Sequence, residues 1–203
     1  PHMLKITGVV GAFAILAALS SAALAQGWDL SRYSVEDRRS GYLFLGEKTR
    51  ALQDDDFINP GMFAVDHGRA LWNTEVGEAG KSCASCHGDA AESMRGVATR
   101  YPQFDPGRNG IMNLELRINE ERVRHMMAPP LEYESEELLA LTAFVANQSR
   151  GLALDVEISG PATPFFELGK EFYFQRRGQL DLACNQCHDN LDGMMLRGDR
   201  MSQ

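Results

Sequence analysis

The sequence predicts an all-α fold of two tandem domains related by duplication, the second of them incomplete. Three observations lead to this prediction. A Cys-x-x-Cys-His pentapeptide occurs twice, a gapless repeat with an offset of 101 residues relates the two copies, and apolar residues precede each copy with helical spacing. The composition, with 44% hydrophobic residues in 203, is that of a globular chain and not of a disordered one.

Residues 1–25 have the pattern of an export signal and are excluded from the fold. The two residues before Met3 are interpreted as a cloning remnant. Lys5 is followed by the apolar run 6–19 and by small residues that end in Ala23-Leu24-Ala25, an A-x-A-type cleavage site. The apolar run is too short for a membrane span. We therefore expect an exported, periplasmic protein with no stable membrane span after signal cleavage.

The net charge excludes one class of partner. The formal charge of the whole sequence is -8, and removal of residues 1–25, which hold one lysine and no acid, makes it -9. Because an acidic surface repels the phosphate backbone, we expect no nucleic acid partner.

The first domain is predicted over residues 26–155. A turn led by Pro60 precedes a helix with an apolar and aromatic stripe, in which Trp72 is interpreted as helix core. After the first pentapeptide come a loop rich in Pro and Gly, a helix over about 112–127 and a helix over about 135–149. The last of these has the amphipathic pattern of a closing helix that packs against the first one.

The second domain is predicted to start at residue 156 and to be cut short at residue 203. The offset of 101 residues matches Pro161 to Pro60 and Tyr173 to Trp72. By the same offset, the second closing helix belongs near positions 236–250, beyond the last residue. We therefore expect a C-terminally truncated form of a longer protein, with its second site largely uncovered.

All four cysteines lie in the two pentapeptides, Cys83-Ala84-Ser85-Cys86-His87 and Cys184-Asn185-Gln186-Cys187-His188. On one turn of helix, residues three and four apart share a face, so both thiols reach one porphyrin edge while the imidazole reaches the iron. The spacing predicts two covalent haem c groups in two cytochrome c-like domains. His87 and His188 are the predicted axial iron ligands.

Three other uses of the cysteines fit less well. A zinc site is disfavoured because 97 residues separate the two pairs and zinc does not require a histidine directly after each pair. Thiol oxidoreductase motifs lack that histidine and lie near a βαβ pattern, which is not found here. Plain disulfides suit an exported protein but leave both histidines unexplained.

Several segments are specific beyond the pentapeptides: Ser40-Gly41-Tyr42-Leu43-Phe44-Leu45, Gln53-Asp54-Asp55-Asp56-Phe57, Asn59-Pro60-Gly61-Met62, Gly80-Lys81-Ser82-Cys83, Ser149-Arg150-Gly151, Gly160-Pro161, Gly178-Gln179-Leu180 and the run from Cys184 to Asp189. In these segments the sequence resembles the SoxA family, the A subunits of SoxAX cytochromes. The resemblance implies a periplasmic L-cysteine S-thiosulfotransferase. It also implies a small SoxX-like cytochrome as partner, thiosulfate as substrate and a SoxYZ-like carrier protein whose cysteine receives it, with two electrons leaving through haem.

The sequence departs from that family at two positions that matter for chemistry. The family's reactive cysteine, the distal ligand of the second haem, lies in a C-terminal part that this sequence lacks, so no catalytic residue is assigned. The family also places a cysteine opposite the first haem, where this sequence has Glu121.

The distal ligand of the first haem is therefore left open. His125, Met126 and Met127 are candidates, Met94 and Met112 are weaker ones, and the alternative is that all are ordinary core or surface residues. His67 is interpreted as structural.

Two function classes follow. The first is a SoxAX-like enzyme subunit, and the second is a two-haem electron carrier without chemistry of its own, which the haem motifs support equally well.

Overall fold

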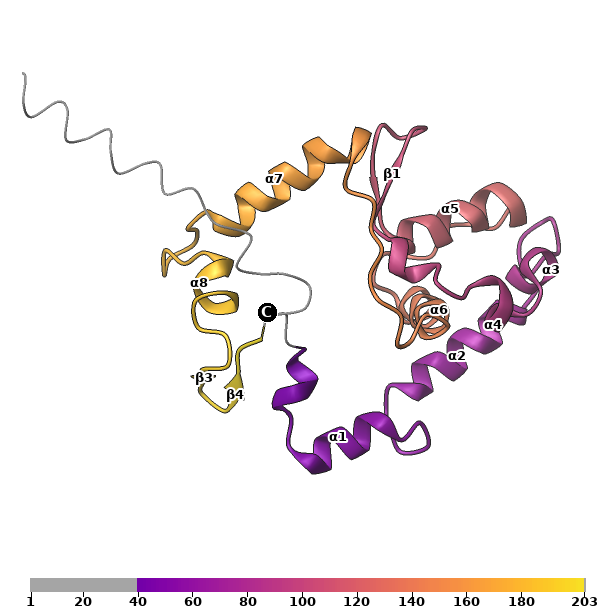
Figure 1. Ribbon diagram of the computed structural model, residues 1–203. Coiled ribbons are helices and arrows are strands. Elements are labelled where there is room, and N and C mark those ends of the chain that lie inside the picture. The colour runs from indigo at the N-terminus through magenta and orange to yellow at the C-terminus, as the bar shows by residue number, and fades with distance from the viewer. Residues whose placement is uncertain (1–39, 203) are drawn as a thin grey trace, which may run out of the picture.

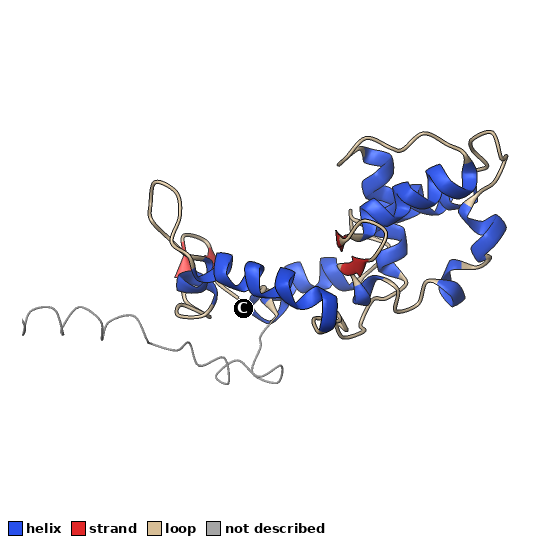
Figure 2. Cartoon of the chain, turned by 90° about the horizontal axis from the view of Figure 1, so that it is seen from above, coloured by secondary structure: helices blue, strands red, loops and turns tan. Residues whose placement is uncertain are grey.

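The computed structural model describes residues 40–202, and Figure 1 shows the course of the chain through them. Helices dominate, as the all-α prediction requires, and strands form only two short hairpins in the described part (Figure 2). The predicted signal segment lies outside the described residues. Within 40–202, no helix combines the length and the apolarity that crossing a bilayer requires.

The helices follow one another in the order α1 Glu47–Asp54, α2 Met62–Asn73, α3 Cys83–His87, α4 Ala90–Ser93, α5 Leu114–Met126, α6 Glu136–Asn147, α7 Thr163–Phe174 and α8 Cys184–His188, with short 3-10 turns at Gly41–Phe44, Ala98–Arg100 and Gly160–Ala162. The predicted helices at about 112–127 and 135–149 correspond to α5 and α6. Each begins at a side-chain cap, since Asn113 accepts from the amide of Leu116 and Ser135 accepts from the amide of Leu138.

The core of the first part forms where α2 crosses α6, so the predicted packing of the closing helix against the first helix is confirmed. Gly68 stands at this crossing. A Cβ atom at position 68 would lie 2.0 Å from the carbonyl oxygen of Ala140, so only glycine allows the two backbones to approach this closely. The buried cluster around the crossing consists of Val65, Trp72, Ala90, Met94, Leu141, Phe144 and Val145. Trp72 is therefore core, as predicted.

Two hairpins differ from the all-α prediction. Strand β1, Gln103–Asp105, pairs antiparallel with β2, Gly110–Met112, and β3, Met195–Leu196, pairs with β4, Asp199–Arg200. In the first hairpin, the amide of Arg108 donates to Oδ1 of Asp105 at 2.8 Å and closes the turn. Strands of two or three residues are too short to produce an alternating pattern, so the sequence predicted only a loop in place of the first hairpin and no element in place of the second.

The segment after α5 is fixed by a side-chain clamp. Met127 adopts a left-handed conformation and ends α5. Asn119 then binds the chain that follows, since its Nδ2 donates to the carbonyl of Leu131 at 3.0 Å and its Oδ1 accepts from the amide of Leu131 at 2.8 Å. Both bonds are partly buried, so the clamp holds α5 against the start of the α6 segment.

We expect Asn119→Ala to lower the free energy of unfolding by about 2 kcal/mol, because two partly buried hydrogen bonds are lost and the backbone groups of Leu131 lose their partners. Urea denaturation followed by far-ultraviolet circular dichroism measures this change. Asn73→Ala is the matched control, since Asn73 makes one exposed bond to the carbonyl of Arg69. Equal losses for both variants contradict the clamp.

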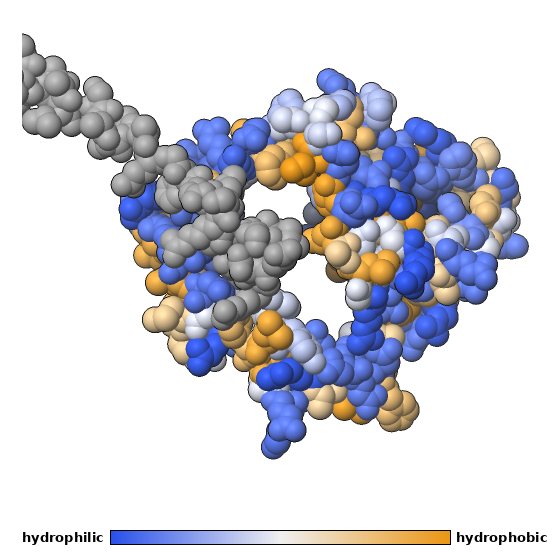
Figure 3. All heavy atoms as spheres, in the orientation of Figure 1, coloured by the Kyte–Doolittle hydropathy of each residue, from blue (hydrophilic) through white to orange (hydrophobic). Residues whose placement is uncertain are grey.

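The second part repeats the start of the first at a constant spacing. Helices α2 and α7 begin at residues 62 and 163, and helices α3 and α8 begin at residues 83 and 184. An isolated β-bridge precedes each pentapeptide, between Val76 and Lys81 in the first part and between Arg177 and Leu182 in the second. All three features lie 101 positions apart. Unlike α2, helix α7 buries none of its residues. In the space-filling view, openings separate the part around α7 and α8 from the part around α2 and α6 (Figure 3).

Candidate haem-binding site

The first pentapeptide forms helix α3, and its ends are fixed by local hydrogen bonds. Ser82 and Ser85 form a capping box, in which each side chain accepts from the backbone amide of the other. At the other end, Gly88 adopts a positive φ of 65°, and its carbonyl accepts from Nε1 of Trp72 at 3.2 Å. The buried Trp72 of α2 thus orients the short helix that carries both thiols and the imidazole.

A cavity of about 590 Å³ opens in front of these groups. Cys83, Cys86 and His87 line it together with side chains from α5 and the loop before it. The ring centroids of Trp72 and His87 lie 5.7 Å apart, so the indole forms part of the wall beside the imidazole. The apolar lining consists of Trp72, Met94, Val97, Leu114, Ile118, Met126 and Val145. This volume falls within the roughly 300–1,000 Å³ typical of sites for small molecules and cofactors.

The residues present fit a covalently attached haem. Both cysteines are free thiols spaced for thioether bonds, His87 supplies an imidazole from the same helix, and the walls are largely apolar. Arg122 also lines the cavity, and its buried Nε has no hydrogen-bond partner in the described part of the protein. An orphaned cation in the wall suits a cofactor with carboxylate groups.

The environment of Cys83 differs from that of an ordinary surface thiol. Burial raises the pKa of Cys83, the Arg122 guanidinium opposes this effect, and the Glu121 carboxylate is one of the smaller causes that raise the pKa further. The thiol is therefore stabilised in its neutral form. Two charged side chains of α5 act on this sulfur.

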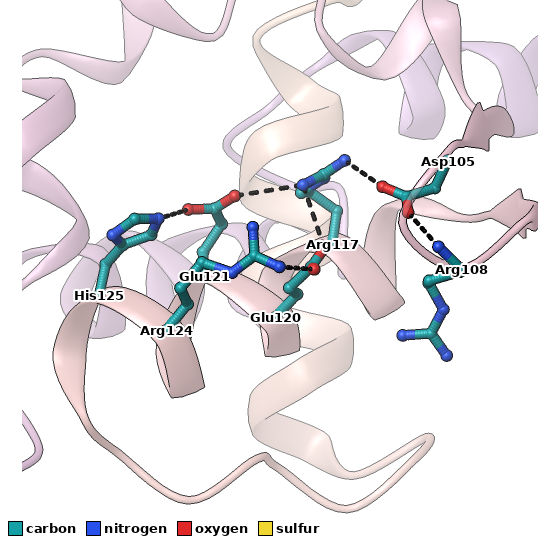
Figure 4. Close-up of polar contacts among 7 residues, drawn as sticks. All are labelled: Asp105, Arg108, Arg117, Glu120, Glu121, Arg124 and His125. Atoms are coloured by element: carbon teal, nitrogen blue, oxygen red, sulfur yellow. Dashed lines mark hydrogen bonds and ion pairs between the residues drawn. The ribbon is translucent and has the colours of Figure 1, made fainter.

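Helix α5 carries a chain of ion pairs along the cavity (Figure 4). Arg117 is its hub, with contacts to Asp105 at 3.2 Å, to Glu120 at 3.0 Å and to Glu121 at 3.5 Å. Glu121 in turn contacts Nε2 of His125 at 3.3 Å. Among these residues, Arg117, Glu121 and His125 line the cavity. The pattern i, i+4, i+8 places all three on one face of the helix.

The structure divides the candidate distal residues into two groups. His125, Met126 and Met94 line the cavity, whereas Met112 is fully buried elsewhere and Met127 is exposed and outside the lining. The structural interpretation of His67 agrees with its position, since His67 pairs with Glu136 of α6 at 3.6 Å and does not line the cavity.

The second pentapeptide forms helix α8, and its imidazole has a defined tautomer. Nδ1 of His188 donates to the carbonyl of Ser202 at 2.6 Å, which leaves Nε2 as the nitrogen for a metal. Tyr173 of α7 donates to Asp189 directly after the helix at 2.8 Å, as Trp72 does to Gly88 in the first part. Tyr173 is half-buried, whereas its counterpart Trp72 is buried.

The second pentapeptide is as exposed as the first. Cys184 and His188 are exposed, as are Cys86 and His87 in the first part. A hollow of about 720 Å³ follows α7, but no residue of α8 lines it. Within residues 40–202, no group of three or more His, Cys, Asp or Glu side chains is arranged to hold a metal ion by itself.

Sequence reasoning missed the ion pairs that hold Arg117 on α5. Arg117 and Glu120 are ordinary charged residues in the sequence, and their roles depend on Asp105 in the distant β1 strand. The only available signal was the spacing of Arg117, Glu121 and His125 on one helical face.

The fold and the first site define a c-type cytochrome. A family model described as SoxA/TsdA, cytochrome c domain, matches residues 67–154, which include α3, its cavity and α6. This match assigns covalent haem c to the chain. The chain belongs to the SoxA family, since relatives with that name are 39–44% identical to it.

Three relatives show the extent of the similarity. The SoxA subunit of an L-cysteine S-thiosulfotransferase from Pseudaminobacter salicylatoxidans is 44% identical over 165 residues, or 81% of this chain and 58% of that protein. The SoxA subunit from Rhodovulum sulfidophilum is 39% identical over 83% of this chain and 58% of that protein. The crystal structure of SoxXA from P. pantotrophus matches with a TM-score of 0.76 and 38% identity, over 82% of this chain and 62% of that chain. The chain thus spans somewhat more than half the length of these relatives.

Proposed function

We propose that the chain binds two haem c groups in two cytochrome c-like units, residues 26–155 and 156–203, that arose by duplication. The constant spacing of 101 positions between α2 and α7, between α3 and α8 and between the two isolated bridges supports this proposal. The first haem is held by Cys83, Cys86 and His87. The second is held by Cys184, Cys187 and His188.

The proposed function is that of a periplasmic subunit of a SoxAX-like L-cysteine S-thiosulfotransferase. The observation that carries it is the 44% identity over 165 residues to a SoxA subunit with that name. In this reaction a sulfur–sulfur bond forms between thiosulfate and a cysteine of a SoxYZ-like carrier protein. The thiol proton and two electrons leave, and the electrons pass out through haem to a SoxX-like small cytochrome.

The chain's own residues prepare the first site for this role. When bound, haem c supplies one-electron redox chemistry. Trp72 and the capping box of α3 hold the two thiols and the His87 imidazole in one orientation. The apolar part of the lining would limit the water around a bound haem, which would lower the solvent reorganisation that accompanies a change of charge. In the second site, the bond from His188 to the Ser202 carbonyl fixes the imidazole tautomer.

Haem counting tests the two-haem proposal. The chain is produced with haem-maturation machinery, and its intact mass and haem-to-protein ratio are measured. We expect the mass of the polypeptide plus two haem groups. Cys83→Ala/Cys86→Ala and Cys184→Ala/Cys187→Ala are each expected to retain one haem, so a wild-type protein with one haem contradicts the second site.

A second candidate function is that of a two-haem electron carrier. The two pentapeptides support it equally well, because they supply residues for haem attachment and iron ligation and no other chemistry. The two functions separate when the natural gene product, its small cytochrome partner and the carrier protein are incubated with thiosulfate. An enzyme subunit adds thiosulfate to the carrier, seen as a mass increase. If the chain exchanges electrons with its small cytochrome partner while the mass of the carrier protein stays unchanged, the chain is an electron carrier only.

A further inference from the structure

The α5 wall of the first cavity has one carboxylate among its lining residues. The side chains that α5 contributes recur at spacings of three and four residues and so form one face: Leu114, Arg117, Ile118, Glu121, Arg122, His125 and Met126. Glu121 lies near the middle of this face. It is the single Asp or Glu side chain in the described lining of the cavity.

The Glu121 carboxylate is held from both sides along the helix axis (Figure 4). Nη1 of Arg117 lies 3.5 Å from Oε1, and Nε2 of His125 lies 3.3 Å from Oε2. Arg117 is fixed in turn by Asp105 and Glu120. Because a nitrogen of a different side chain lies within 3.5 Å of each oxygen, the two ion-pair contacts orient the carboxylate in the wall.

The field of this carboxylate reaches the haem-attachment side of the cavity. After burial and the opposing Arg122 guanidinium, Glu121 is among the groups that raise the pKa of Cys83. Glu121 and both attachment thiols line the same cavity, so the carboxylate lies in a wall of the volume that a haem on Cys83 and Cys86 would enter.

The other candidates in the wall are less suited to face the iron. His125 already directs Nε2 to Glu121, and its side chain is 57% exposed, compared with 37% for Glu121. Met126 is buried at the last turn of α5, directly before the left-handed residue Met127. Glu121 is both central in the lining face and oriented by neighbours.

We propose that Glu121 is the distal group of the first haem site, with its carboxylate facing the iron across from His87 and with Arg117 and His125 as positioning residues. A carboxylate is a weak-field oxygen ligand, so the ferric first haem is high-spin and its sixth position is open to exchange. This inference depends on haem attachment to Cys83 and Cys86, as in the proposed function, but not on the reaction with thiosulfate.

Azide binding to the ferric, haem-loaded chain tests the proposal. Every protein in this test carries Cys184→Ala/Cys187→Ala, so that only the first haem is present and the second cannot bind azide. We expect Glu121→Gln to bind azide about tenfold more tightly than the wild type, because a competing ligand and a negative charge next to the anion are both removed. Glu120→Gln is the matched control. Glu120 is the adjacent residue and also pairs with Arg117, yet it does not line the cavity. We expect its azide affinity to stay within about twofold of wild type.

Haem content, measured in every variant, separates two kinds of failure. A wild-type chain without haem on Cys83 and Cys86 defeats the proposed function itself. If Glu121→Gln attaches less haem than the wild type, Glu121→Asp is measured in its place. The shorter aspartate side chain keeps the negative charge but moves the carboxylate oxygens away from the iron. We again expect azide to bind more tightly than in the wild type, by a smaller factor than for Glu121→Gln.

Electron paramagnetic resonance supplies the opposing outcomes. In the Cys184→Ala/Cys187→Ala protein, a ferric first haem with no high-spin component overturns the proposal, as does unchanged azide affinity in the Glu121 variants. Loss of a low-spin signal in His125→Ala or in Met126→Leu identifies an imidazole or a thioether as the distal ligand instead.

Discussion

Gly68→Ala is expected to lower the free energy of unfolding by about 3 kcal/mol, because the new methyl group overlaps the backbone of α6. Its Cβ would lie 2.0 Å from the carbonyl oxygen of Ala140 and 2.6 Å from Cβ of Phe144. A backbone oxygen cannot rotate away as a flexible side chain can, so α2 and α6 must separate and expose part of the core cluster. Denaturation of the haem-loaded protein followed by circular dichroism measures the loss.

The duplicated part of the chain offers a control for this prediction. Gly169 is the counterpart of Gly68 in α7, and a Cβ atom there meets no atom within 4 Å. Gly169→Ala is expected to be neutral or to stabilise α7 by about 0.5 kcal/mol, because alanine restricts the unfolded chain and favours helix. Similar losses for the two variants contradict the tight α2–α6 crossing.

Much of the first part of the fold could be predicted from residue spacing. The helices predicted at about 112–127 and 135–149 differ from α5 and α6 by only one or two residues at each end. The repeat spacing of 101 residues is met by the bounds of α2 and α7. These features depend on local patterns such as apolar periodicity and caps, which a sequence displays directly.

What could not be predicted depends on contacts between distant segments. The hub role of Arg117 needs Asp105 from β1, and the Asn119 clamp needs Leu131, twelve residues further along. Helix α1 buries none of its residues, so its sequence has no strong apolar pattern from which the helix could be predicted. The pentapeptides predict which residues attach haem, but the place of Glu121 in the cavity lining depends on the packing of α5 against α6.

The second large effect is expected at Trp72, which connects the core to the haem helix. Its side chain is 5% exposed, packs 5.8 Å from the Phe144 ring centroid and donates to the Gly88 carbonyl at the end of α3. Trp72→Ala is expected to lower the free energy of unfolding by about 3–5 kcal/mol through the cavity that it leaves. The same loss frees the end of α3, so a smaller yield of haem at the first site is expected as well.

Trp72→Phe separates packing from the hydrogen bond. Phenylalanine keeps an aromatic ring in the core but removes Nε1, so the Gly88 carbonyl loses its indole donor and the cost falls to about 1–2 kcal/mol. Tyr173→Phe removes the corresponding bond to Asp189 in the second part, where α7 buries none of its residues, and a loss below about 1 kcal/mol is expected. Thermal unfolding and the haem-to-protein ratio are measured for all three variants. Trp72→Ala at wild-type stability and haem content excludes a structural connection between α2 and α3, whereas a large loss in Tyr173→Phe shows that α7 is packed more tightly than its exposure indicates.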